Sequence, residues 1–213
     1  MLEQEVLAVA QAAKNASPAL AQATAQERNA ALTAMARALR DRSGAIVAAN
    51  AQDMDAARQA GTKESLLDRL MLDEGRVMAM ADALEDLVAL PDPLSRVFDS
   101  RTLDSGIQLS RVAVPLGVVA VVYEARPNVT ADAAGICLKS GNAAVLRGGS
   151  MAAASNEVMQ KSLMMAAPST CKVAIVPVEK AVAFCNDPRA EALSILVIVS
   201  NPDDLLTIAR ETH

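Results

Sequence analysis

The chain has 213 residues, a net charge of −5 at pH 7 and a hydrophobic content of 52%, but aromatic residues make up only 1%. This length suits one large domain or two small ones, and the rarity of aromatic residues indicates alanine-rich, closely packed helices. The acidic balance argues against a nucleic-acid-binding protein, since no cluster of lysine and arginine stands out that would bind phosphates. Three cysteines are too few for a disulfide framework. Together with an acidic N-terminus and the lack of a membrane-spanning run, this favours a cytoplasmic protein without a membrane partner.

Residues 1–90 have the apolar spacing of helices. One helix is predicted from Gln26 to Arg40. A second is expected to begin at a Ser43 cap and to end near Gly61, and Asp73 is expected to cap a third. The buried stripe of the third helix consists of Val77, Met80, Leu84, Leu87 and Val88.

A β-hairpin is predicted after the helix-breaking segment 91–93. Residues 96–103 and 107–114 have strand-like patterns, and Asp104-Ser105-Gly106 between them is typical of a turn. Spacing alone leaves open whether the hairpin protrudes or forms an ordinary sheet edge.

The stretch from Val114 to Ser150 predicts one βαβ unit. Residues 117–122 and 143–146 are short apolar runs typical of buried strands. Asn128 is expected to cap the helix between them, and Gly141-Asn142 to end it with a left-handed C-cap.

Charged and small residues follow both predicted strands, where parallel sheets bind ligands. Arg126 suits bidentate pairing with a phosphate or a carboxylate group of a ligand. The structural alternative is an ion pair with Glu124 or with a helix end. Arg147-Gly148-Gly149-Ser150 combines a guanidinium and a hydroxyl with backbone that a ligand can approach closely, and a plain strand-to-helix turn is the alternative.

The remaining sequence predicts further α/β elements. A helix is expected to start at Ser155 and to stop before Pro168, and strands are expected at 172–176 and 195–199. Asn201-Pro202-Asp203-Asp204 has the cap, proline and acidic residues of a helix start.

Several motifs together resemble those of the γ-glutamyl phosphate reductase family of the aldehyde dehydrogenase superfamily. They are ANAQD at 49–53, LLDRL at 66–70, VPLGV at 114–118, YEARPNVT at 123–130, LKSGNA at 138–143, LRGGS at 146–150 and PSTC at 168–171. The resemblance implies an aldehyde-dehydrogenase-like α/β fold. Residues 1–165 would hold a helical N-terminal layer, an oligomerisation hairpin at about 95–114 and a parallel cofactor-binding sheet. Residues 166–213 would hold discontinuous pieces of a second, catalytic domain.

The same resemblance implies the NADPH-dependent reduction of L-glutamyl 5-phosphate to L-glutamate 5-semialdehyde, with release of phosphate, in proline biosynthesis. It makes Cys171 the nucleophile that forms a thioacyl intermediate, with Ser169 and Thr170 in the substrate-binding loop. Relatives usually have asparagine where this chain has Lys172, a cation that favours the thiolate. A homo-oligomer and functional pairing with glutamate kinase are also implied.

The resemblance further implies that Arg147, with Gly148, Gly149 and Ser150, binds the cofactor. An arginine at this position suits a 2′-phosphate and therefore NADP(H). For the oxyanion, it leaves two choices open, Asn128 and a group near Glu124.

The other cysteines, Cys137 and Cys185, are interpreted as buried structural residues. No group of residues has metal-ligand spacing, so no metal site is expected.

The helix from Ser155 runs almost directly into the PSTC motif, whereas members of the resembled family are much longer and hold a large block there. Two interpretations remain. We favour a sequence that joins pieces of a longer protein; the alternative is a shortened, non-catalytic homologue that serves as an oligomerisation or partner-binding module.

Overall fold

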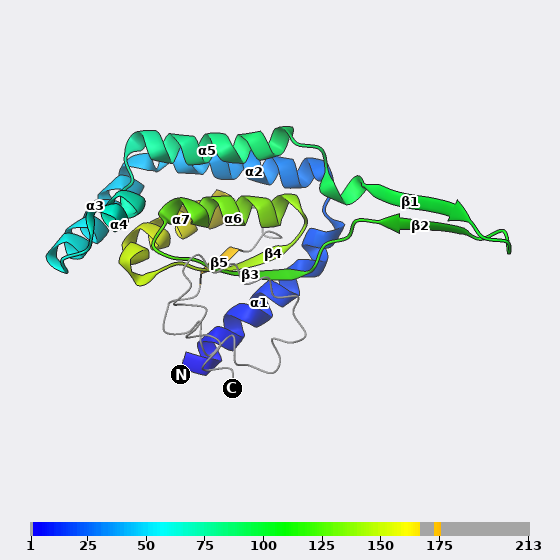
Figure 1. Ribbon diagram of the computed structural model, residues 1–213, viewed down its shortest axis with the longest axis horizontal. Helices are drawn as coiled ribbons and strands as arrows, with labels where there is room; N and C mark the ends of the chain where they lie inside the picture. The colour runs from blue at the N-terminus through cyan, green and yellow to red at the C-terminus, as the bar shows by residue number, and fades with distance from the viewer. Residues whose placement is uncertain (1, 167–172, 176–213) are drawn as a thin grey trace.

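The computed structural model describes residues 2–166 and 173–175. Helices α2 and α5 lie over α6 and α7, which cover one face of a small sheet, and α1 crosses the other face (Figure 1). Helices α3 and α4 lie at one end of this body, and a hairpin extends from the other (Figure 1). The N-terminal helices are α1 (Leu2–Gln22), α2 (Ala25–Asp41), α3 (Ser43–Gln59), α4 (Glu64–Leu70) and α5 (Glu74–Ala89).

Side-chain capping explains where α5 begins, but not where α3 begins. The Asp73 carboxylate accepts a hydrogen bond from the Arg76 N–H at 2.7 Å, which confirms the predicted cap of α5. The predicted Ser43 cap is wrong, because Arg42 both ends α2 and precedes α3. Ser43 is therefore already the first residue of α3.

The predicted βαβ unit is confirmed. Strands β3 (Val118–Val122), β4 (Ala143–Arg147) and β5 (Val173–Ile175) form a parallel sheet in the order β3-β4-β5. All five residues of β3 are buried. Helix α6 (Pro127–Lys139) connects β3 to β4, so the loops after both strands lie at one edge of the sheet. The elements predicted at 195–199 and after Asn201 lie outside the described residues.

The end of α6 is confirmed as predicted, but its start is not. Gly141 has a φ of +72°, and the Asn142 N–H bonds the Cys137 carbonyl oxygen at 2.8 Å, which is a Schellman ending. Asn128 is not the N-cap, because Pro127 occupies the first helical position and Arg126 precedes it. The Asn128 amide instead donates to Asp132 Oδ2 at 3.3 Å.

Helix α7 (Ala153–Ala166) follows a short 3₁₀ turn, η2 (Ser150–Ala152), and so begins two residues before the predicted Ser155. Its cap comes from α3, where the Asp53 carboxylate accepts from the Ser155 N–H at 2.8 Å and from the Ser155 hydroxyl at 2.6 Å. A tertiary contact therefore sets the start of this helix.

The predicted hairpin is present and protrudes. After a 3₁₀ turn, η1 (Pro93–Ser95), strands β1 (Val97–Thr102) and β2 (Gln108–Val112) pair antiparallel with each other and stand clear of the body (Figure 1). Every residue of both strands is exposed, including apolar Val97 and Leu109. Its role in oligomerisation stays a prediction.

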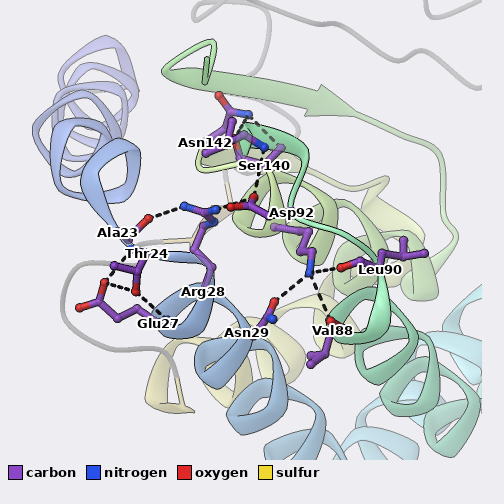
Figure 2. A network of polar contacts seen from close by, with 12 residues as sticks. Ala23, Thr24, Glu27, Arg28, Asn29, Val88, Leu90, Asp92, Ser140 and Asn142 are labelled. Atoms are coloured by element: carbon purple, nitrogen blue, oxygen red, sulfur yellow. Dashed lines mark hydrogen bonds and ion pairs between the residues drawn. The ribbon is translucent and has the colours of Figure 1, made fainter. Parts of the chain in front are cut away.

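A polar network ties α6 to the helical layer (Figure 2). Lys139 is only 6% exposed. Its Nζ donates to the carbonyl oxygens of Leu90 at 2.8 Å and Val88 at 3.3 Å, and to Asn29 Oδ1 at 2.8 Å. The ammonium thus caps the C-terminus of α5. Nearby, the buried Arg28 pairs with Asp92 Oδ1 at 2.7 Å.

This network gives the LKSGNA motif a structural role. Within the motif, Asn142 Oδ1 also accepts from the Gly117 N–H at 2.9 Å, at the start of β3.

In the part of the chain that the structure describes, no helix has the length and hydropathy needed to cross a membrane.

Candidate functional site

The loops that follow β3 and β4 pack directly against each other at the carboxyl edge of the sheet. The Tyr123 N–H donates to the Arg147 carbonyl oxygen at 2.9 Å. A Cβ on Gly149 would lie 2.8 Å from the Ala125 nitrogen and 3.1 Å from the Glu124 carbonyl carbon. The glycine is therefore required by contact between the two loops, and close approach of a ligand to it stays a prediction.

Buried side chains form a rigid layer beneath these loops. The Thr130 hydroxyl donates to Asn156 Oδ1 at 2.8 Å, so the Tyr123 hydroxyl, 2.6 Å away, donates to Thr130 Oγ1. Burial raises the pKa of Tyr123 to about 12. The tyrosine consequently stays protonated at neutral pH and acts as a structural donor.

Arg126 forms the predicted alternative contact, an ion pair with Glu124. Its Nε lies 2.7 Å from Glu124 Oε1, and Arg69 Nη1 lies 3.3 Å from the same oxygen. Glu124 is 19% exposed, while the side chains of Arg126 and Arg69 are 41% and 47% exposed. Two half-exposed guanidinium groups thus share one carboxylate, and this cluster carries a net positive charge. A ligand role for Arg126 remains compatible with the pair, because a guanidinium has five N–H donors.

A groove of about 530 Å³ opens beside this cluster, between α4, α5 and the first turns of α6. Its polar wall consists of Asp68, Arg69, Arg76, Arg126, Asn128 and Asp132, and its apolar wall of Met71, Leu72, Ala79, Met80 and Ala83. Burial raises the pKa of Asp132, and the hydrogen bond from Asn128 partly offsets that effect.

Arg147 ends β4 beside the glycine loop. Its Nε is buried and has no hydrogen-bond partner among the described residues. Ser150 is exposed at the start of η2. A buried guanidinium nitrogen without a partner is suited to an anionic group of a ligand, because leaving it unpaired is costly.

The predicted site is only partly within the described residues. Cys171, Ser169, Thr170 and Cys185 lie outside them. Cys137 is buried, and burial raises its pKa to about 11, so this thiol fits the predicted structural role. Within residues 2–166 and 173–175, no cluster of His, Cys, Asp and Glu is able to hold a metal ion.

Sequence reasoning missed four charged residues of the groove, Asp68, Arg69, Arg76 and Asp132. Asp68 and Arg69 lie in the LLDRL motif at 66–70 but were assigned no role. Asp132 lies four residues after Asn128 on α6, and this spacing places both side chains on one helical face. In the sequence, this four-residue spacing is the signal that places Asp132 beside Asn128.

The chain is similar to two curated γ-glutamyl phosphate reductases. The protein from Thermobifida fusca is 47% identical over 169 residues, covering 79% of this chain and 40% of that protein. The protein from Moorella thermoacetica is 45% identical over 202 residues, covering 95% of this chain and 47% of that protein. The chain is a homologue of the γ-glutamyl phosphate reductases. It spans less than half the length of these relatives.

Solved structures confirm the aldehyde-dehydrogenase-like fold. The γ-glutamyl phosphate reductase from Thermotoga maritima matches with a TM-score of 0.89 at 35% identity, over 98% of this chain and 51% of that one. A succinic semialdehyde dehydrogenase from Streptococcus pyogenes, solved with NADP⁺, matches with a TM-score of 0.72 at 18% identity, over 98% of this chain and 43% of that one, and shows the fold alone.

One family model also matches, described as the PTS system sorbose subfamily IIB component, over residues 149–212. This range is less than half of the chain, and the described part of it, from Gly149 through α7 and β5, belongs to the aldehyde-dehydrogenase-like fold above.

Proposed function

We propose that the protein of which this chain forms at least a part is a glutamate-5-semialdehyde dehydrogenase. It reduces L-glutamyl 5-phosphate to L-glutamate 5-semialdehyde with NADPH and releases phosphate, as a step of proline biosynthesis. The observation that carries the proposal is the 45–47% identity to γ-glutamyl phosphate reductases across 79–95% of the chain. The positive cluster at the carboxyl edge of the sheet supports it, because the substrate is an anion.

In this proposal Cys171 is the nucleophile. Its thiolate attacks the acyl carbon, the carbon–oxygen bond to phosphate breaks, and a thioester forms on the sulfur. After reduction, the thiohemiacetal collapses to the aldehyde and regenerates the thiolate. Phosphate leaves the acyl carbon in the forward reaction and attacks the thioester in the reverse reaction. The reaction therefore requires no general base to activate water. Ser169 and Thr170 belong to the same substrate-binding loop in this proposal.

For the oxyanion, the candidates are Asn128 and a group near Glu124, and we favour Asn128. The Glu124 carboxylate itself is ion-paired with two arginines, and a carboxylate accepts hydrogen bonds rather than donating them. Asn128 is exposed beside the groove, and its amide has a second N–H besides the one directed at Asp132.

Arg147 fits a nucleotide cofactor, since its buried Nε has no partner among the described residues. We assign the 2′-phosphate of NADP(H) to Arg147 and Ser150, beside the turn of Gly148 and Gly149. The cofactor supplies the hydride when it is bound. The residues of the chain hold and orient it.

The test is the reverse reaction, in which NADP⁺ reduction is followed with glutamate 5-semialdehyde and phosphate. Cys171→Ala should abolish the activity, and Cys185→Ala serves as the matched control. Activity that survives Cys171→Ala would exclude the thioacyl route.

The exposed hairpin favours a second candidate, a non-catalytic module for oligomerisation or partner binding. Val97, Ile107 and Val112 are each at least half exposed on a hairpin that contacts no other strand of the described sheet. A folded, inactive chain that forms dimers, and loses them after Ile107→Asp and Val112→Asp, supports this candidate. Pairing with glutamate kinase is proposed for either candidate, since an acyl phosphate must come from a phosphorylating enzyme.

A further inference from the structure

We infer that the groove between α4, α5 and α6 binds the amino-acid end of the substrate. Asp132 receives the α-ammonium group, and the Arg69–Arg126 pair receives the α-carboxylate. The inference rests on the proposed function and names the residues that would select an α-amino acid derivative over acyl phosphates that lack the amino group.

Asp132 is a carboxylate that lacks a cationic partner. Among the described residues its hydrogen-bond donor is the Asn128 amide at 3.3 Å, and no lysine or arginine of that part of the chain forms an ion pair with it. Its partial burial in the groove wall removes solvation from the charge. An ammonium group of a ligand would restore the missing interaction.

The opposite charge lies at the strand end of the same groove. Arg69 and Arg126 share the single carboxylate of Glu124, so one positive charge remains unbalanced in this cluster. Both guanidinium groups are partly exposed and line the groove. They therefore have N–H donors available for a carboxylate.

The third arginine of the groove is neutralised. Arg76 Nη2 lies 2.9 Å from Asp68 Oδ1, and its Nη1 donates to the carbonyl oxygens of Asp68 and Met71 at 2.6 and 3.0 Å. This pair holds the junction of α4 and α5. The groove thus presents one unbalanced negative and one unbalanced positive charge, a pattern complementary to a zwitterion.

Both charged groups lie at the start of α6. Arg126 precedes the helix and Asp132 lies in its second turn. Both residues line the groove, so a ligand in it can contact both.

The test is an NMR titration of the ¹⁵N-labelled chain with L-glutamate, glutarate and 4-aminobutyrate. Glutarate lacks the ammonium group, and 4-aminobutyrate lacks the α-carboxylate. We expect L-glutamate to bind at least about tenfold more tightly than glutarate, with shifts in the amides of Arg69, Arg126 and Asp132. Asp132→Asn should reduce L-glutamate binding to the glutarate level. Asp86→Asn, on the exposed surface of α5, is the matched control and should change the binding of neither L-glutamate nor glutarate.

Arg126→Gln supplies an independent variant. It should weaken L-glutamate and glutarate together and leave 4-aminobutyrate unchanged. Melting temperatures of all variants verify that they are folded.

Undetectable L-glutamate binding overturns the inference, and so does a preference over glutarate that survives Asp132→Asn. Because binding requires no turnover, the two proposals are separable. An inactive chain with the predicted preference retains this inference and loses the proposed function. An active chain whose preference is unaffected by Asp132→Asn retains the proposed function and loses this inference.

Discussion

The carboxylate of Asp53 on α3 caps α7 by bonding both the backbone N–H and the hydroxyl of Ser155, at 2.8 and 2.6 Å. The two residues are 102 positions apart. Asn50, one turn earlier on α3, donates from Nδ2 to the Leu70 carbonyl oxygen at 2.8 Å and accepts from the Leu72 N–H at 2.7 Å. The ANAQD motif therefore joins α3 to the end of α4 and to the start of α7.

Replacing Asp53 should destabilise the fold. Asp53→Ala removes three hydrogen bonds to a buried carboxylate, so we expect a loss of about 2–3 kcal/mol in the free energy of unfolding. Urea denaturation measures this loss. Asp55→Ala, at an exposed position of the same helix, should leave the unfolding midpoint unchanged. Equal losses in both variants would contradict the capping role.

Lys139 should be a second stabilising residue. Lys139→Met leaves the acceptors Val88 O, Leu90 O and Asn29 Oδ1 without their donor. We expect a loss of about 2–3 kcal/mol, measured in the same way. Lys161→Met, which removes an exposed lysine whose ion-pair partner among the described residues is Glu157, is the control and should not shift the midpoint. An unchanged midpoint for Lys139→Met would show that water replaces the ammonium.

Tyr123 should ionise only at high pH. It is the single tyrosine of the chain, so absorbance at 295 nm reports on it alone. We expect a midpoint near its pKa of about 12 in the native protein, and near 10 in denaturant. Because the pKa of Tyr123 is raised in the native state, the protonated tyrosine favours the folded protein. Its contribution to the free energy of unfolding is complete below pH 10 and is lost as the pH rises towards 12. Tyr123→Phe should lack that loss, and a native midpoint near 10 would mean that the ring is solvated.

Cys137 should resist alkylation in the folded protein. With a pKa of about 11, roughly one thiol in a thousand is ionised at pH 8, and burial blocks access further. Iodoacetamide labelling followed by peptide mass mapping should modify Cys137 only after denaturation. Labelling of native Cys137 as fast as that of a free thiol would contradict its burial.

Gly149→Ala should disturb the edge of the sheet. The new Cβ would meet the Ala125 nitrogen at 2.8 Å, so the two loops must separate, at a cost of about 1–3 kcal/mol. Gly44→Ala, in α3, adds a Cβ with no atom within 4 Å and should leave stability equal or higher. Thermal unfolding measures the melting temperatures of the two variants. Equal melting temperatures would exclude the close contact between position 149 and the Ala125 nitrogen.

Local patterns in the sequence determined much of this fold. The buried runs at β3 and β4, the Asp73 cap and the ending at Gly141 depend on residues that are neighbours in the chain, so they are predictable without tertiary structure. The family motifs likewise identified the homology. The start of α6 also depends on neighbouring residues. There, the preference of Pro127 for the first helical position outweighed the capping preference of Asn128.

The tertiary structure alone decided features that join distant segments. It placed the start of α7 through Asp53, buried Lys139 against the end of α5, and brought Arg69 of α4 to the loop of Arg126. In these cases the partners are 102, 49 and, through Glu124, 55 residues apart. Hydrogen bonding and ion pairing act over a few ångströms, so such contacts follow from packing rather than from sequence spacing.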